Sequence, residues 1–192
     1  MKKKILVGIL SLMLVFTLAG CAPKNAVKNA VDKAAPKKQI KGNCEALECV
    51  KKLKPENTVE EINKVIGFEG KLTDEKNNIY TWEITSDEKV TASYYSSDKA
   101  TIEASYKNED LKNSKVDFSK YDEIQSALKS GSSLTYDEFC KKVNAEGVLY
   151  SVSSYSNKYV WVNKNGEYLT GTFSTSTNKC TFVIGRISKS SN

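Results

Sequence analysis

Cysteine is the residue type in this chain with the widest choice of chemistry, because a thiol can be acylated, oxidised or activated as a nucleophile. The five cysteines are Cys21, Cys44, Cys49, Cys140 and Cys180, and the 192 residues contain no histidine. The commonest general base and the commonest metal ligand are therefore missing. The sequence also has no glycine-rich phosphate loop and no metal-ligand spacing. We expect no enzyme activity, no metal and no cofactor.

The N-terminal segment favours lipidation of its cysteine. Three lysines precede an apolar run that ends at Leu18, and Ala19 and Gly20 lie directly before Cys21. The run is short for a helix that crosses ~30 Å of hydrocarbon, and the order of charged, apolar and small residues is typical of a secretory signal. Leu18-Ala19-Gly20-Cys21 resembles the lipobox of bacterial lipoproteins. The resemblance implies that residues 1–20 are a signal peptide, cleaved between Gly20 and Cys21, and that the Cys21 sulfur carries diacylglycerol, with palmitate as a typical acyl chain. An ordinary signal peptide with an incidental cysteine is the alternative.

Residues 21–42 are predicted to be the lipidated cysteine and a flexible tether. Residues 22–42 hold six lysines, one aspartate and two prolines, without an aromatic side chain. Such a segment buries too little apolar surface to offset the entropy of ordering. Its lysines favour contact with an anionic membrane surface, and they serve equally well to keep a spacer soluble.

The positive charge belongs to this N-terminal part. The formal net charge is +6, whereas residues 43–192 carry 20 basic and 22 acidic side chains. A folded region so close to neutrality lacks the basic surface that nucleic-acid binding needs. We therefore expect a chain that is lipid-anchored on the extracytoplasmic side of the cell membrane and has no nucleic-acid partner.

Two similar segments follow the tether, and we place their boundaries at 43–115 and 116–192. Thr58 to Ile62 (TVEEI) corresponds to Thr135 to Phe139 (TYDEF), 77 residues later. Each begins a helix, because a threonine followed three residues later by a glutamate forms a capping box. A shorter helix is expected before each one, around Val50 and around Ile124.

After the helices, both segments alternate apolar and polar residues with period two, as half-buried strands do. The apolar sets are Tyr80, Trp82 and Ile84; Val90, Ala92 and Tyr94; Ile102, Ala104 and Tyr106; Tyr159 and Trp161; Leu169, Gly171 and Phe173; and Cys180, Phe182 and Ile184. Strands with one apolar face suit an antiparallel sheet backed by a helix pair. The sequence thus predicts an α+β fold of two tandem helix-loop-helix plus four-stranded antiparallel sheet modules.

Several motifs resemble a known family. FSKYDEI (118–124), TYDEF (135–139), NAEG (144–147), YVWV (159–162) and GEYLTGTF (166–173) are similar to β-lactamase-inhibitory-protein-like domains. The resemblance covers residues 43 to about 187 and implies the tandem fold given above. It also implies a protein-binding surface made of two sheets, with an acidic hairpin residue of the first copy at the partner's site. Asp87 lies in the hairpin that matches best, although a solvated turn residue is the alternative.

The sheet face opposite the apolar sets is the better candidate for binding, since Trp82 and Trp161 are predicted to be core. On that face the second copy carries Val160, Val162 and Val183, where the first copy carries polar residues. Apolar side chains gathered on an exposed face normally mark contact with a partner. The alternative is that the two sheets cover one another there, or that the segment 107–118 covers these valines.

Three tyrosines are further candidates for partner binding. Tyr95, Tyr150 and Tyr155 lie outside the core alternation or in the long first strand of the second copy. Tyrosine offers a large contact area with a polar tip, which suits interfaces. Tyrosines are also ordinary on exposed sheets, so both interpretations stay open.

Cys140 and Cys180 are predicted to form a disulfide. Cys140 shares its helical stripe with Phe139, and Cys180 shares strand parity with Phe182, so both side chains point into one helix–sheet interface. On a continuous helix Cys44 and Cys49 point to different sides, and we expect them to bond only if Cys44 precedes the helix. Four unpaired thiols are the alternative.

These features predict a membrane-anchored extracytoplasmic lipoprotein that binds an unknown envelope or secreted protein through its sheet face, without catalysis. The alternative is a structural or assembly component of the cell envelope that contacts cell-wall polymer or a membrane complex.

Replacing Cys21 by alanine should block lipidation and cleavage, because the sulfur that carries the lipid is lost. In cells fed a clickable palmitate analogue, the Cys21→Ala chain should stay unlabelled and keep its precursor mass. Cys44→Ala is the matched control and should be labelled and cleaved like the wild type. A Cys21→Ala chain that is processed and retained on the membrane would contradict the lipobox.

Overall fold

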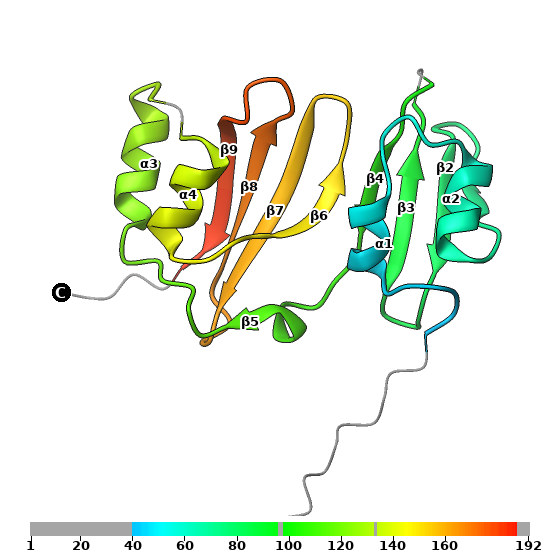
Figure 1. Ribbon diagram of the computed structural model, residues 1–192, viewed down its shortest axis with the longest axis horizontal. Coiled ribbons are helices and arrows are strands. Elements are labelled where there is room, and N and C mark those ends of the chain that lie inside the picture. Colours follow the sequence, from blue (N-terminus) through cyan, green and yellow to red (C-terminus); the bar gives the residue numbers. More distant parts are fainter. Residues whose placement is uncertain (1–39, 96–97, 133, 188–192) are drawn as a thin grey trace, which may run out of the picture. The chain divides into compact units, whose positions relative to one another are not determined.

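The computed structural model describes residues 40–95, 98–132 and 134–187, which form a mixed α+β fold. The first half of this region contains α1 (Ala46–Lys52), α2 (Val59–Ile66), β1 (Lys71–Asp74), β2 (Ile79–Glu83), β3 (Lys89–Ser93) and β4 (Thr101–Ala104). A 3-10 turn, η1 (Asn108–Leu111), and the short strand β5 (Lys112–Asn113) lead to the second half. This half contains α3 (Tyr121–Lys129), α4 (Tyr136–Val143), β6 (Val148–Val152), β7 (Ser156–Asn163), β8 (Tyr168–Ser174) and β9 (Cys180–Arg186) (Figure 1).

Both predicted capping boxes are confirmed. Thr58 Oγ1 accepts a hydrogen bond from Glu61 N at 3.3 Å, and the Glu61 carboxylate accepts one from Thr58 N at 3.0 Å. Thr135 and Glu138 make the same two bonds, at 3.3 and 2.8 Å. These bonds satisfy backbone N–H groups that have no partner inside the helix, so α2 and α4 begin at fixed residues.

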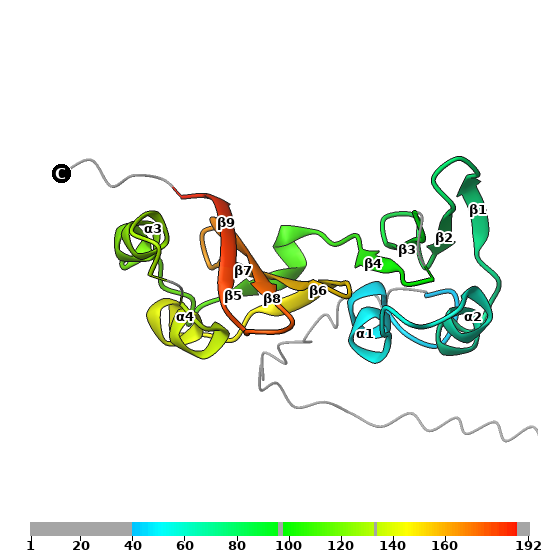
Figure 2. The same ribbon diagram turned by 90° about the horizontal axis from the view of Figure 1, so that it is seen from above.

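The strands form one sheet in the order β1-β2-β3-β4-β6-β7-β8-β9, and β5 also pairs with β7. Among the described strands every pair is antiparallel except β5 with β7. The α1 and α2 helices lie on one face of β2–β4, and α4 lies on one face of β7 and β8 (Figure 2). We call the side of the sheet away from these helices the open face.

The two tryptophans are core residues, as predicted, and each occupies space left by a glycine. Trp82 and Trp161 are at most 1 % exposed. Their indole nitrogens donate hydrogen bonds to the Asn63 side chain at 2.8 Å and to the Ala145 carbonyl at 3.0 Å. A Cβ on Gly70 would strike the Trp82 ring, and one on Gly147 would lie 2.6 Å from the Trp161 ring. Each indole can pack here only because the facing residue has no side chain.

The two halves of the sheet meet where β4 pairs with β6. Ile102 lies opposite Val152, and Glu103 lies opposite Ser151. Val152 joins the hydrophobic cluster of the first half, whereas Phe139, Trp161 and Phe173 belong to the cluster of the second half. The sheet is therefore shared by the two halves, while each half keeps its own core.

An ion pair crosses this junction on the open face. Lys158 Nζ lies 2.7 Å from Glu103 Oε1. Burial lowers the pKa of Lys158, but the hydrogen bond to Glu103 and the opposite charge outweigh it, so the net direction is upward. The lysine therefore stays charged and holds β7 of the second half to β4 of the first.

The outer strands offer little room for further strand pairing. The four-residue strand β1 has a register shift between Leu72 and Asp74. The α3 helix lies beside β9 (Figures 1 and 2), and the backbone N–H of Cys180 donates to Leu134 O at 2.6 Å. Short, irregular or covered edges are the usual protection against unwanted strand addition.

The substitution Gly147→Ala should destabilise the fold by roughly 1–3 kcal/mol, because the added Cβ overpacks against the Trp161 ring. Urea unfolding of the full chain measures this cost. The cost should fall in a Trp161→Phe background, where the facing ring is smaller. Equal costs in the two backgrounds would mean that the indole does not explain the glycine.

Candidate functional site

The open face of β9 carries two apolar side chains that the alternation had assigned to the core. Thr172 pairs with Phe182 and Phe173 pairs with Cys180, so β9 has one extra residue at this point, a β-bulge. The bulge reverses the parity of the strand after Cys180. Phe182 and Ile184 are consequently 59 % and 57 % exposed, and their prediction as core residues was wrong.

The same bulge changes the predicted valine patch. Val183 turns inward and packs against the core of the second half. Val160 and Val162 stay on the open face, opposite Thr170 and Tyr168, but they are buried. The prediction that these three valines form an exposed patch was therefore wrong.

The segment that leads from β4 to β5 accounts for the burial of Val160 and Val162. The η1 turn packs against β7, and β5 pairs with β7 at Val162. Just before η1, the Tyr106 ring lies 5.2 Å from the Tyr150 ring, at 61° between the ring planes. Cover by the chain between the two copies was the alternative to an exposed patch, and the packing of η1 against β7 supports it.

Tyr106 and Tyr150 are therefore part of the fold on the open face rather than free side chains. Burial, with smaller contributions from Tyr150 and Tyr168, raises the pKa of Tyr106. Burial also raises the pKa of Tyr150. Both phenols stay neutral at any physiological pH. Tyr106 had been assigned to the core face, and that assignment was wrong because the chain leaves the sheet after Ala104.

Tyr95 and Tyr155 are exposed, and the structure brings them together. Tyr95 follows β3, Tyr155 lies between β6 and β7, and their exposed fractions are 62 % and 86 %. The pairing of β4 with β6 places these two hairpins side by side, and both tyrosines line one hollow of about 320 Å³.

Asp87 is an exposed residue of the turn between β2 and β3. Its backbone N–H donates to Thr85 Oγ1 at 3.2 Å, and its carboxylate lies 2.8 Å from Lys107 Nζ. Ion pairs as exposed as this one contribute at most about 1 kcal/mol. The role of Asp87 in partner binding stays a prediction.

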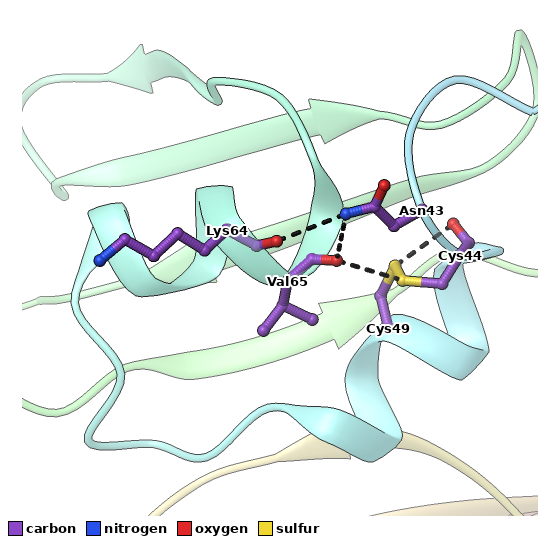
Figure 3. Close-up of a disulfide and its surroundings, with 5 residues drawn as sticks. All are labelled: Asn43, Cys44, Cys49, Lys64 and Val65. Atoms are coloured by element: carbon purple, nitrogen blue, oxygen red, sulfur yellow. Dashed lines mark hydrogen bonds between the residues drawn. A yellow bond between two sulfur atoms is a disulfide. The ribbon is translucent and has the colours of Figure 1, made fainter.

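Cys44 and Cys49 form a disulfide, with their Cα atoms 5.5 Å apart (Figure 3). The condition set for this pair is met, because Cys44 precedes the first residue of α1, Ala46. The side-chain amide of Asn43 donates to the carbonyls of Lys64 and Val65 at 3.4 Å. Both cysteines are buried, and the disulfide closes the start of α1 on itself. The hydrogen bonds of Asn43 hold this part of the chain next to the end of α2.

The predicted disulfide between Cys140 and Cys180 is wrong, since both are free thiols. Cys180 lies beside the residues just before α4, where its N–H donates to Leu134 O. Cys140 lies one turn further along α4, beside Tyr136, whose hydroxyl is hydrogen-bonded to Gly147 N at 3.1 Å. The two thiols share one helix–sheet interface but lie at different places along it.

Gly20 and Cys21, with the signal peptide and all but the last residues of the tether, lie outside the described residues. Within residues 40–95, 98–132 and 134–187, no helix has the length and apolar character to cross a membrane. The same residues hold no group of three or more side chains placed to bind a metal ion. Comparison with known proteins finds no matching family model, no matching curated protein and no matching solved structure.

Peptide mapping of the full chain without reductant should show the Cys44–Cys49 linkage and free thiols at Cys140 and Cys180. At pH 8, in the folded protein, iodoacetamide should modify half-buried Cys140 before Cys180, because burial shields Cys180 and raises its pKa to about 11. The protonated thiol is thus favoured in the folded state. Its contribution to stability is complete below the ordinary thiol pKa of 9.0 and is lost as the pH rises toward 11.

Denaturant provides the control for this experiment, since the two thiols should react at the same rate once the chain is unfolded. A linked Cys140–Cys180 peptide, or faster labelling of Cys180 in the folded chain, would contradict the structure.

Proposed function

We propose that this chain is a lipid-anchored protein of the extracytoplasmic membrane surface that binds another protein through the open face of its sheet, without catalysis. The proposal of a lipid anchor rests on the sequence motif that ends at Cys21. Protein binding rests on one observation, the exposure of Phe182 and Ile184 side by side on the open face of β9.

The surroundings of these two side chains suit a protein contact. Thr172 and Thr170 lie opposite Phe182 and Ile184 on β8, and exposed Arg186 follows on β9. Apolar side chains at the centre with polar and charged groups around them are the usual arrangement of a protein interface. The partner is therefore a protein with an apolar patch of its own.

We also propose that the two halves of the sheet are tandem modules of the β-lactamase-inhibitory-protein-like kind, with boundaries at 43–115 and 116–192. The support is that each half has two helices followed by four strands, a capping box on the second helix, and a tryptophan packed on a glycine. Superposition of residues 58–106 on 135–187 in an experimental structure tests the repeat.

Partner binding should depend on Phe182 and Ile184. A photoreactive phenylalanine analogue at position 182 of the full, anchored chain should form an adduct with another envelope protein in intact cells. That protein, once purified, should bind the Phe182→Ala, Ile184→Ala double variant about 30-fold more weakly than the wild type. This factor corresponds to the loss of about 2 kcal/mol of apolar burial.

The matched control is Leu72→Ala, which also removes an exposed apolar side chain but lies on β1, at the other end of the sheet from β9. Its affinity should stay within about threefold of the wild type. Unchanged binding by the β9 variant would contradict the proposed surface. Retention of the chain on purified wall material, without any protein adduct, would favour the envelope-structural alternative.

A further inference from the structure

The hollow between Tyr95 and Tyr155 is separate from the β9 surface and has a different chemistry. It lies between two hairpins, one from each half of the sheet, and measures about 320 Å³. Small-molecule sites begin at about this size, and a hollow that joins two parts of a fold is a common place for one.

The walls of the hollow are rich in hydroxyl groups. Ser93, Thr101, Ser153 and Ser154 all line it. The Ser154 hydroxyl is buried, and Ser153 Oγ is hydrogen-bonded within its own turn. The hydroxyls left for a ligand are those of Ser93, Thr101 and the two exposed tyrosines. A hydroxyl both donates and accepts hydrogen bonds. These walls therefore suit a ligand that itself carries many hydroxyl groups.

The hollow carries almost no net charge. Lys99 is the one charged residue among the described residues that line it, and its ammonium lies 3.3 Å from the Glu56 carboxylate. An ion bound here would meet a charge that is already balanced. These walls therefore suit a neutral molecule better than an ion.

The tyrosine between β6 and β7 stands on a well-ordered turn. Ser153 Oγ accepts from Tyr155 N at 3.4 Å and from Ser156 N at 3.0 Å. From the next hairpin, Thr175 donates through its N–H to Tyr155 O at 3.0 Å and through its hydroxyl to Ser154 O at 2.8 Å. The backbone that holds this exposed ring is thus fixed before any ligand arrives, which lowers the entropy lost on binding.

Apart from its two tyrosines, the hollow offers little to a protein partner. Protein interfaces depend on aromatic, aliphatic or arginine side chains that enter pockets. The lining offers one aliphatic side chain, Ala100, and no carboxylate for an arginine among its described residues. A sugar ring presents C–H groups on one face, which pack on a tyrosine ring, and hydroxyls around its edge, which match the walls.

We propose that this hollow binds a neutral saccharide, with Tyr95 and Tyr155 packing on sugar rings and the hydroxyls of Ser93 and Thr101 bonding to the sugar hydroxyls. The site does not rest on the proposed protein-binding function, because it uses other residues at another part of the sheet.

The probes are neutral trisaccharides of glucose, of N-acetylglucosamine and of mannose, offered to the full chain in detergent micelles. Saturation-transfer NMR should show contact with at least one of them, strongest at the C–H protons of one ring face. Calorimetry should give an affinity that changes little between low and high salt, since no charge is neutralised. Tyr155→Ala or Tyr95→Ala should each weaken binding roughly 3- to 10-fold, and Tyr155→Phe, which keeps the ring, should retain most of it.

Phe182→Ala is the matched control, because it removes an exposed aromatic ring outside the hollow, and it should bind the sugar like the wild type. Far-UV circular dichroism establishes that each variant is folded. Absence of saturation transfer with all three sugars would overturn the proposal, and so would sugar binding that is unchanged in the tyrosine variants. Photo-crosslinks from positions 95 and 155 to a protein, without sugar binding, would assign the hollow to a protein instead.

Discussion

The pairing of β4 with β6 is the contact on which the arrangement of this protein depends. It joins two segments that each have their own helices and their own core, through Ile102 with Val152 and Glu103 with Ser151. Without it, Glu103 and Lys158 would not meet, and the hairpins that carry Tyr95 and Tyr155 would not share a hollow. The hollow therefore depends on a strand junction in which the two hairpin tyrosines take no part.

Local interactions made most of the fold predictable from the sequence. A capping threonine acts on a glutamate three residues away, so Thr58 and Thr135 marked the start of α2 and α4 without knowledge of the rest of the chain. Alternation within a strand is equally local, and it placed Trp82 and Trp161 in the core. These predictions needed only the residues of one element, which is why they succeeded.

The candidate site was harder to predict, because it depends on contacts between distant segments. A single extra residue in β9 exchanges the faces of Phe182 and Val183, and the sequence of β9 contains no glycine or proline at that point to mark the bulge. The burial of Val160 likewise depends on where the chain after β4 runs. The Cys140–Cys180 prediction failed for a related reason. The helical stripe and the strand parity predict that both thiols face the same interface, but they do not predict how far along the helix each one lies.

The placement of the Cys44–Cys49 disulfide has a mechanical consequence for a chain held by its N-terminus. Just before it, Lys41 N donates to Ile84 O and Asn43 N donates to Ile66 O, both at 2.8 Å. In a lipid-anchored chain, a pull on a bound partner is transmitted to the membrane through these residues. Once these two hydrogen bonds break, the disulfide passes the force from Cys44 directly to Cys49, so the residues between them carry no load. In an anchored chain, a covalent link would thus lie at the point where tension enters the fold.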